Sequence, residues 1–204
     1  MFEIAMALRL KGMAGPEAVA EVTAIDSTEV EQVLIQMVDA GRASETPRGY
    51  RLTPEGKAWT DEQIAVEREG IDADAMAAVY ERFCDHNDGF KELVTDWQMK
   101  MVDGEQQLND HSDADYDAAI FERLAVLDAQ IAPVFADASL LAPRLSIYID
   151  RFAAALAAVQ GGDESMLASP LKDSYHTVWF EMHEELILLS GRNRADEAAA
   201  GRGA

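Results

Sequence analysis

Apolar residues recur at helical spacing in three short stretches at the start of the chain. The first two stretches, residues 1–11 and 16–22, are separated by glycines. Asp26, followed three positions later by Glu29, is a capping box that opens the third stretch, whose apolar stripe ends before Gly41. The pattern therefore predicts three short helices in this part of the chain.

Two strand-like pieces, 42–45 and 49–52, follow the third helix, and a turn sequence that contains Pro47 separates them. Thr53 and Pro54 then suit the N-cap and the first position of a fourth helix. Helix, short helix, turn, helix, hairpin and helix is the order of a winged helix-turn-helix. The hairpin would be its small β-hairpin wing.

The spacing inside the turn carries a resemblance to a known group. Ala20 lets two helices approach, Ala24 lies in the turn, and Ile25 fills the core beneath it. Together with the phrase Leu52-Thr53-Pro54-Glu55-Gly56-Lys57, these residues resemble the MarR-like winged-helix transcription regulators. Such motifs most often have Gly where this chain has Ala24, and the departure is mild if φ is negative there.

Helical periodicity continues through the rest of the chain. Apolar residues three and four positions apart mark helices at 53–84, 90–101, 113–131, 143–160 and 170–189. Residues 85–89 are expected to form a turn, residues 102–113 the longest loop, and no strand pattern follows Tyr50.

The sequence therefore predicts a mainly α protein with three parts. We expect a winged helix-turn-helix domain at 1–60, an all-α helical bundle for dimerisation or ligand sensing at 61–191, and a flexible tail at 192–204.

Acidity qualifies this picture. The 204 residues carry 17 Lys+Arg against 38 Asp+Glu, which gives a net charge of −21. A single cysteine excludes a disulfide framework, and no run approaches the roughly 18 apolar residues of a membrane span. The chain has no nucleophile elbow, no phosphate-binding glycine loop and no HExxH sequence. We expect a cytoplasmic protein that is not an enzyme.

A protein this acidic binds DNA only where its basic residues are concentrated. The third helix offers polar side chains for base edges but no Lys or Arg: Ser27, Thr28, Gln32 and Gln36. Its Glu29 and Glu31 would face phosphates. Basic residues gather instead between positions 42 and 57, at Arg42, Arg48, Arg51 and Lys57. DNA binding through the wing and a role in protein interaction or dimer scaffolding are therefore both open.

The second half contains candidate ligand residues. All four histidines lie there, at positions His86, His111, His176 and His183. Imidazole beside carboxylates is typical of metal sites, but this spacing matches no established metal motif, and the pattern identifies no cofactor. Candidates for an organic ligand pocket are Trp97, Tyr175, His176, Trp179 and His183. The alternative for these five is packing in the core.

Longer phrases carry a second resemblance. Residues 93–98, 109–117 and 173–184 resemble an uncharacterised actinobacterial family that pairs a winged helix with this helical domain. Similar segments occur near pyruvate phosphate dikinase-like proteins. Three hypotheses result, and in the third of them the chain is a metal- or ligand-sensing module that uses His176 and His183. The first is a homodimeric transcription regulator that binds double-stranded DNA and responds to a small-molecule effector. The second is a regulatory subunit of a phosphoenolpyruvate- or pyruvate-related enzyme that does not touch DNA.

Overall fold

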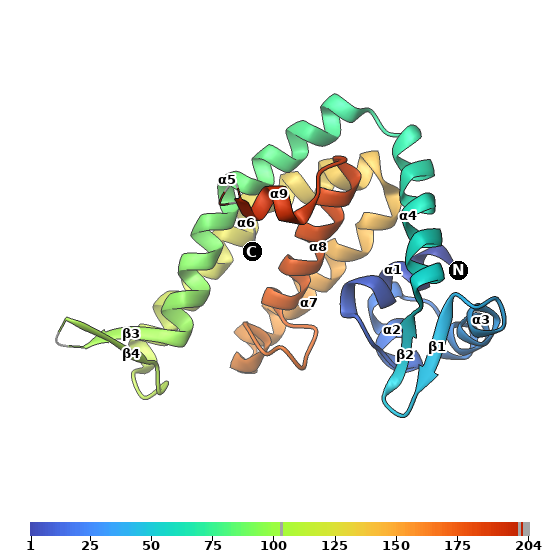
Figure 1. Cartoon of the computed structure of the whole chain (residues 1–204). Helices are drawn as coiled ribbons and strands as arrows, with labels where there is room; N and C mark the ends of the chain where they lie inside the picture. Colours follow the sequence, from blue (N-terminus) through green and yellow to red (C-terminus); the bar gives the residue numbers. More distant parts are fainter. Residues whose placement is uncertain (103, 200, 202–204) are drawn as a thin grey trace. The chain divides into compact units, whose positions relative to one another are not determined.

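The computed structural model describes residues 1–102, 104–199 and 201, and it is mainly helical (Figure 1). The chain divides into two compact units, Met1–Asp72 and Ala73–Ala204. The boundary lies later than the predicted one after residue 60. The reason is that the fourth helix packs on the first, where Arg9 forms an ion pair with Asp61 at 2.6 Å.

The elements of the first unit follow the predicted order. They are α1 (Phe2–Lys11), α2 (Pro16–Thr23), α3 (Ser27–Asp39), β1 (Ala43–Thr46), β2 (Gly49–Leu52) and α4 (Pro54–Glu69). Their apolar stripes meet in one core, which includes the fully buried Ile4, Leu8, Val19, Val30 and Leu34. Burial of these side chains stabilises the unit by roughly 1.5–3 kcal/mol each.

Ala24, which ends α2, adopts the left-handed conformation, with φ 54° and ψ 24°. The condition under which alanine is a mild departure from glycine at this turn, a negative φ, is therefore not met. The chain must reverse between α2 and α3, and the left-handed conformation achieves this in a short turn. Because a Cβ is crowded there, Ala24 costs about 1 kcal/mol relative to an unstrained residue.

The hairpin of β1 and β2 is held against the segment that precedes α2. Ala14 and Tyr50 exchange two backbone hydrogen bonds, of 3.0 and 2.8 Å. Gly49 has φ +122°, and a Cβ there would lie 2.6 Å from the carbonyl of Ala14. Glycine is therefore required at this position, and the hairpin is anchored to the body of the unit.

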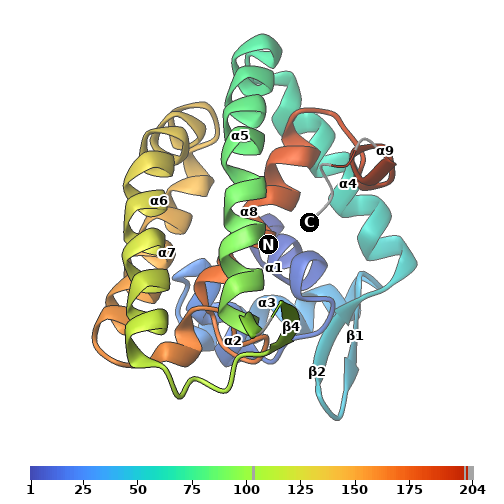
Figure 2. The same ribbon diagram turned by 90° about the vertical axis from the view of Figure 1, so that its left-hand side faces the viewer.

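The second unit is built on four long helices, α5 (Ala73–Gln98), α6 (Ala114–Leu141), α7 (Ser146–Gln160) and α8 (Tyr175–Leu189). α5 packs on α6, α6 on α7, α7 on α8, and α8 returns to α5 (Figure 2). Short 3-10 turns at Pro143–Leu145 and Glu164–Met166 complete the connections. The core is aromatic and contains Phe83, Phe90, Phe135, Phe152 and Trp179.

Residues 85–89, expected to form a turn, lie inside α5. The polar sequence there does not break the helix because Asn87 faces the core. Its Oδ1 accepts the indole Nε1–H of Trp179 at 2.9 Å. Because Trp179 is distant in the sequence, the local pattern around residue 87 could not predict that this stretch is helical.

A second hairpin interrupts the helices where only a loop was expected. β3 (Met99–Val102) pairs antiparallel with β4 (Glu105–Leu108). Every residue of β4 is exposed, so no alternation of buried and exposed positions marks it in the sequence. α8 also begins later than expected, at Tyr175, where Ser174 caps it by accepting from the backbone N–H of Thr177.

Part of the predicted flexible tail is ordered. Residues Arg194–Ala199 form α9, and Glu197 on this helix is buried. Its Oε2 accepts the hydroxyl of Tyr80 at 2.6 Å, which ties α9 to α5. Positions 200 and 202–204 of that tail lie outside the described residues.

Buried Arg151 on α7 and half-buried Arg144 in the preceding turn form ion pairs with carboxylates on α8. Arg151 binds both oxygens of Asp173 and reaches Glu181 at 2.6 Å, and Arg144 binds both oxygens of Glu185. Hydrogen bonds raise the pKa of Arg151 against the opposing effect of its burial. Removing one partner of such a pair costs about 3–5 kcal/mol because a buried charge is left alone.

In the described part of the chain, α6 alone has the length and composition that crossing a bilayer would require. One face of it, with Ile120, Leu124 and Ile131, is buried in the second unit. Of its 18-residue window that is apolar enough to cross a bilayer, 28% is buried.

Candidate functional site

The outward face of α3 carries the polar residues proposed for base contacts. Ser27, Thr28, Gln32 and Gln36 are all exposed. The start of the helix is fixed because Asp26 accepts from the backbone N–H groups of Thr28 and Glu29, at 2.9 and 3.4 Å. The face is therefore presented on a capped, rigid helix.

Two exposed arginines mark the hairpin. Arg48 lies in the turn between β1 and β2, and Arg51 lies on β2 opposite Ser44. The Nε of Arg51 donates to the hydroxyl of Ser44 at 3.3 Å. Since the hairpin is anchored at Tyr50, both guanidinium groups extend from a fixed support.

Arg42 and Lys57 flank the hairpin but differ in their environment. The guanidinium of Arg42 stacks on the ring of Trp59 at 4.4 Å and donates to the sulfur of Met1, which leaves it half-buried. Lys57 is exposed in the first turn of α4. Gly56 allows this turn to approach the hairpin, because a Cβ there would lie 1.8 Å from the carbonyl oxygen of Arg42.

Charge divides this surface into two parts. α3 has no Lys or Arg, and its Glu29, Glu31 and Asp39 are exposed. The hairpin presents Arg48 and Arg51 against Glu45 alone. Any polyanion bound here is attracted by the hairpin and repelled by α3.

Most of the predicted ligand residues lie together on α8, but they pack in the core. The hydroxyl of Tyr175 donates to Asp128 at 2.9 Å, and Trp179 is bound to Asn87. Burial raises the pKa of Tyr175 and also that of Asp128. Half-buried His176 packs its ring 5.9 Å from that of Phe90. The polar tips of the two large aromatics are thus satisfied by the protein itself.

His183 differs from its neighbours because it is fully buried and neither ring nitrogen has a hydrogen-bond partner within the described chain. Its ring packs 5.1 Å from Phe83 and 6.0 Å from Tyr80. Burial, followed by the charge of Arg194, lowers the pKa of His183 to about 4. The residue is therefore a neutral imidazole in the folded protein at pH 7.

The structure places Trp97 in a different cluster, with His111. Their ring centroids are 4.0 Å apart, and the Nδ1 of His111 lies 3.1 Å from Asp117 Oδ2. Buried Asn109 donates to the other oxygen of Asp117 at 2.8 Å. His111 has φ +56°, an unusual conformation for a residue with a side chain.

Sequence reasoning missed Asn109 and Asp117, because nothing in a polar stretch marks which carboxylate will be buried. A histidine held by a buried carboxylate is common at metal and catalytic sites. However, no group of three His, Cys, Asp or Glu side chains among the residues described here could hold a metal ion. His86 lies apart in the middle of α5. The second unit therefore presents an oriented imidazole without further ligands around it.

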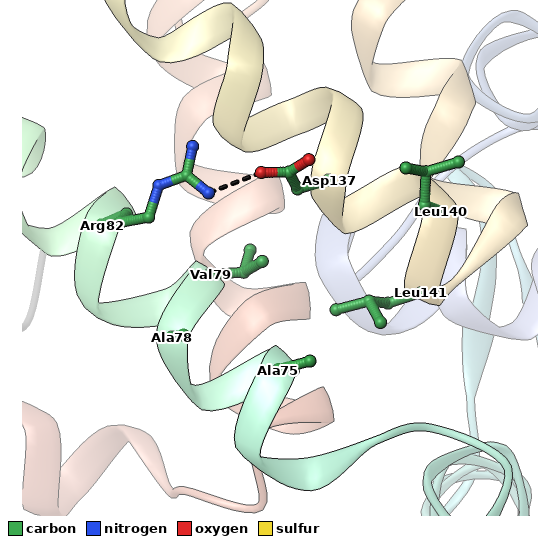
Figure 3. A pocket seen from close by; sticks show the side chains of 7 residues that line it. All are labelled: Ala75, Ala78, Val79, Arg82, Asp137, Leu140 and Leu141. Atoms are coloured by element: carbon green, nitrogen blue, oxygen red, sulfur yellow. Dashed lines mark hydrogen bonds and ion pairs between the residues drawn. The ribbon is translucent and has the colours of Figure 1, made fainter.

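An open, apolar pocket of 330 Å³ lies between α5 and the end of α6 (Figure 3). Ala75, Ala78 and Val79 form its α5 side, and Leu140 and Leu141 its α6 side. Arg82 and Asp137 close one end with an ion pair of 2.5 Å. None of the five predicted ligand residues lines this pocket.

Comparison of the chain with protein-family models, with curated proteins and with solved structures gave no match.

Proposed function

We propose that the protein is a cytoplasmic transcription regulator whose first unit is a MarR-like winged helix that binds double-stranded DNA. The observation that carries the proposal is the pairing of a capped helix, α3, with an anchored hairpin that presents Arg48 and Arg51. Winged-helix proteins use these two elements for the major groove and the DNA backbone.

The two elements have separate tasks in this proposal. Gln32 and Gln36, with Ser27 and Thr28, read base edges from the face of α3. Arg48, Arg51 and Lys57 neutralise phosphates, whereas Arg42 mainly supports the hairpin from its position on Trp59. With so few phosphate contacts and an acidic α3, binding is weak, sensitive to salt and dependent on a homodimer.

DNA binding is tested by fluorescence anisotropy with DNA from upstream of the protein's own gene, at about 50 and about 200 mM salt. Arg51→Ala is expected to weaken binding to all sequences and to lower the salt slope by about one, whereas Gln32→Ala relaxes sequence preference. Arg68→Ala, at an exposed position in the last turn of α4, is the matched control and leaves binding unchanged. Absence of any sequence-specific binding, with or without phosphoenolpyruvate or pyruvate, contradicts the proposal.

The acidic face of α3 favours a second candidate. Here the first unit is a protein-interaction module, and the whole chain is a regulatory subunit of an enzyme of phosphoenolpyruvate or pyruvate metabolism. Glu29, Glu31 and Asp39 would then meet a basic partner surface. Affinity capture from the native host distinguishes the two candidates. The second candidate requires that such an enzyme is recovered with the wild type and is not recovered with Glu31→Lys. Recovery of the chain alone counts against it.

A further inference from the structure

The outward face of α6 carries a regular apolar seam in its second half. The seam consists of Val126, Ala129, Pro133, Ala136 and Leu140, all exposed. Their spacing of three, four, three and four is the a/d pattern by which helices pair. Val126 is 57% and Leu140 82% exposed, although both are large apolar side chains. An exposed repeat of this kind is unusual on a soluble helix whose other face already fills a core.

The small number of charged residues on this face allows another acidic protein to approach it. Between 124 and 141 the only charged residues are Asp128 and Asp137. Each is engaged within the chain, Asp128 by the hydroxyl of Tyr175 and Asp137 by the guanidinium of Arg82. Two copies of a chain with net charge −21 repel each other over most of their surface. The seam itself carries no charged residue that would add to this repulsion.

The seam is also self-complementary. Val126 and Leu140 each lie seven positions from Pro133, so an antiparallel copy related by a two-fold axis near Pro133 brings Val126 opposite Leu140 at both ends. The small side chains of Ala129 and Ala136 allow the two helices to approach closely. From this geometry we propose that the seam is the surface on which a second copy of the chain docks.

The pocket between α5 and α6 extends this surface. Leu140 belongs both to the seam and to the pocket wall, and Figure 3 shows it at the end of α6 beside Leu141. Ala75 and Ala78 continue the apolar surface onto α5. An apolar side chain of the second copy that enters here needs no polar partner, because Arg82 and Asp137 satisfy each other.

The size of the surface sets the strength of the dimer. From 126 to 140 the seam runs about 21 Å along the helix at a rise of about 1.5 Å per residue. Two helices of that length bury less than the roughly 800 Å² per partner of a standard interface. Interfaces of this size are typical of weak or transient complexes, so we expect a dimer that forms and dissociates with concentration. This interface would hold together the homodimer on which the proposed function depends.

Sedimentation velocity of the full chain over a concentration series tests the interface. The wild type is expected to dimerise, and Leu140→Glu and Val126→Glu to raise the dissociation constant by at least about tenfold, since each change acts twice across a two-fold axis. Leu171→Glu, at a leucine that is 94% exposed outside the seam, is the matched control and dimerises like the wild type. Unchanged urea unfolding shows that the variants remain folded.

Cross-linking locates the axis. Pro133→Cys in a Cys84→Ser background is expected to form an intermolecular disulfide on mild oxidation. Ala153→Cys, at an exposed position on α7, is not expected to form one. A chain that stays monomeric, or a dimer that survives both glutamate substitutions, overturns the interface. The interface is also overturned if the monomer binds vesicles of phosphatidylcholine and phosphatidylglycerol and Leu140→Glu abolishes this binding. A bilayer would then cover the seam.

The two proposals fail separately. A dimer that binds no DNA is consistent with the proposed interface and contradicts the proposed function as a transcription regulator. A chain that binds specific DNA as a dimer, and whose dimer survives both Leu140→Glu and Val126→Glu, contradicts the interface and leaves the regulator proposal intact.

Discussion

The indole Nε1 of Trp179 donates to the Oδ1 of Asn87 across the bundle at 2.9 Å, and both side chains are buried. This bond explains why a polar stretch lies inside an unbroken α5. It also makes Trp179 a structural residue and not part of an open pocket.

Asn87→Leu is therefore expected to destabilise the second unit by about 1–3 kcal/mol, because the indole N–H loses its partner in a buried site. Urea unfolding followed by tryptophan fluorescence measures the change. Asp88→Ala removes only the exposed ion pair with Lys91 and is expected to change stability by less than about 0.5 kcal/mol. Equal effects of the two substitutions would contradict a special role for the Trp179–Asn87 bond.

Ala24→Gly is expected to stabilise the first unit by about 1 kcal/mol, since glycine adopts the left-handed conformation without the crowding of a Cβ. Thermal unfolding followed by circular dichroism checks the direction. The matched control is Ala20→Gly inside α2, where glycine is expected to destabilise by roughly 0.5–1 kcal/mol. A lower unfolding temperature for Ala24→Gly than for the wild type would contradict the crowding of a Cβ at this turn.

Tyr80→Phe tests the docking of α9. The substitution removes the hydroxyl that Glu197 accepts and leaves a buried carboxylate with one partner fewer. We expect faster hydrogen exchange over Arg194–Ala199 and a loss of about 1–3 kcal/mol. Tyr50→Phe makes the same chemical change in the first unit and is expected to leave exchange in α9 unchanged. Rapid exchange of this segment in the wild type would show that α9 does not dock in solution.

Local signals predicted the elements of the first unit well. The Asp26 cap, the Thr53–Pro54 start and the apolar stripes were sufficient because each acts within a few residues. The sign of φ at Ala24 could not be predicted locally, since the direction of a turn depends on where the next helix must pack.

The features missed in the second unit depend on distant partners. Asn87 keeps α5 helical through Trp179, and Glu197 orders α9 through Tyr80. The interactions of Arg151 with Asp173 and Glu181 likewise could not be read from a pattern of charges. The candidate ligand residues were chosen as aromatic and imidazole side chains with polar tips. Packing separates Trp97 from the others and leaves the polar groups of Tyr175 and Trp179 already bound.

His183 makes the second unit sensitive to acid. Its pKa is about 4 in the folded protein, against 6.5 for an unperturbed histidine. Between pH 6.5 and 4, His183 is protonated in the unfolded chain but neutral in the folded chain. The contribution of the neutral imidazole to the free energy of unfolding is therefore fully present above pH 6.5 and is lost as the pH falls toward 4. The difference in pKa corresponds to a loss of about 3 kcal/mol at the acid end.

Replacing His183 by Phe removes the titrating group while keeping an aromatic ring between Phe83 and Tyr80. The free energy of unfolding of His183→Phe, measured in urea from pH 4 to 7, is expected to fall less steeply with acid than that of the wild type. Carboxylates titrate alike in both proteins, so the difference between the two curves isolates the imidazole. Parallel curves for His183→Phe and the wild type would mean that His183 gains its proton without unfolding, through a water or a movement of α9 that gives its nitrogens a partner.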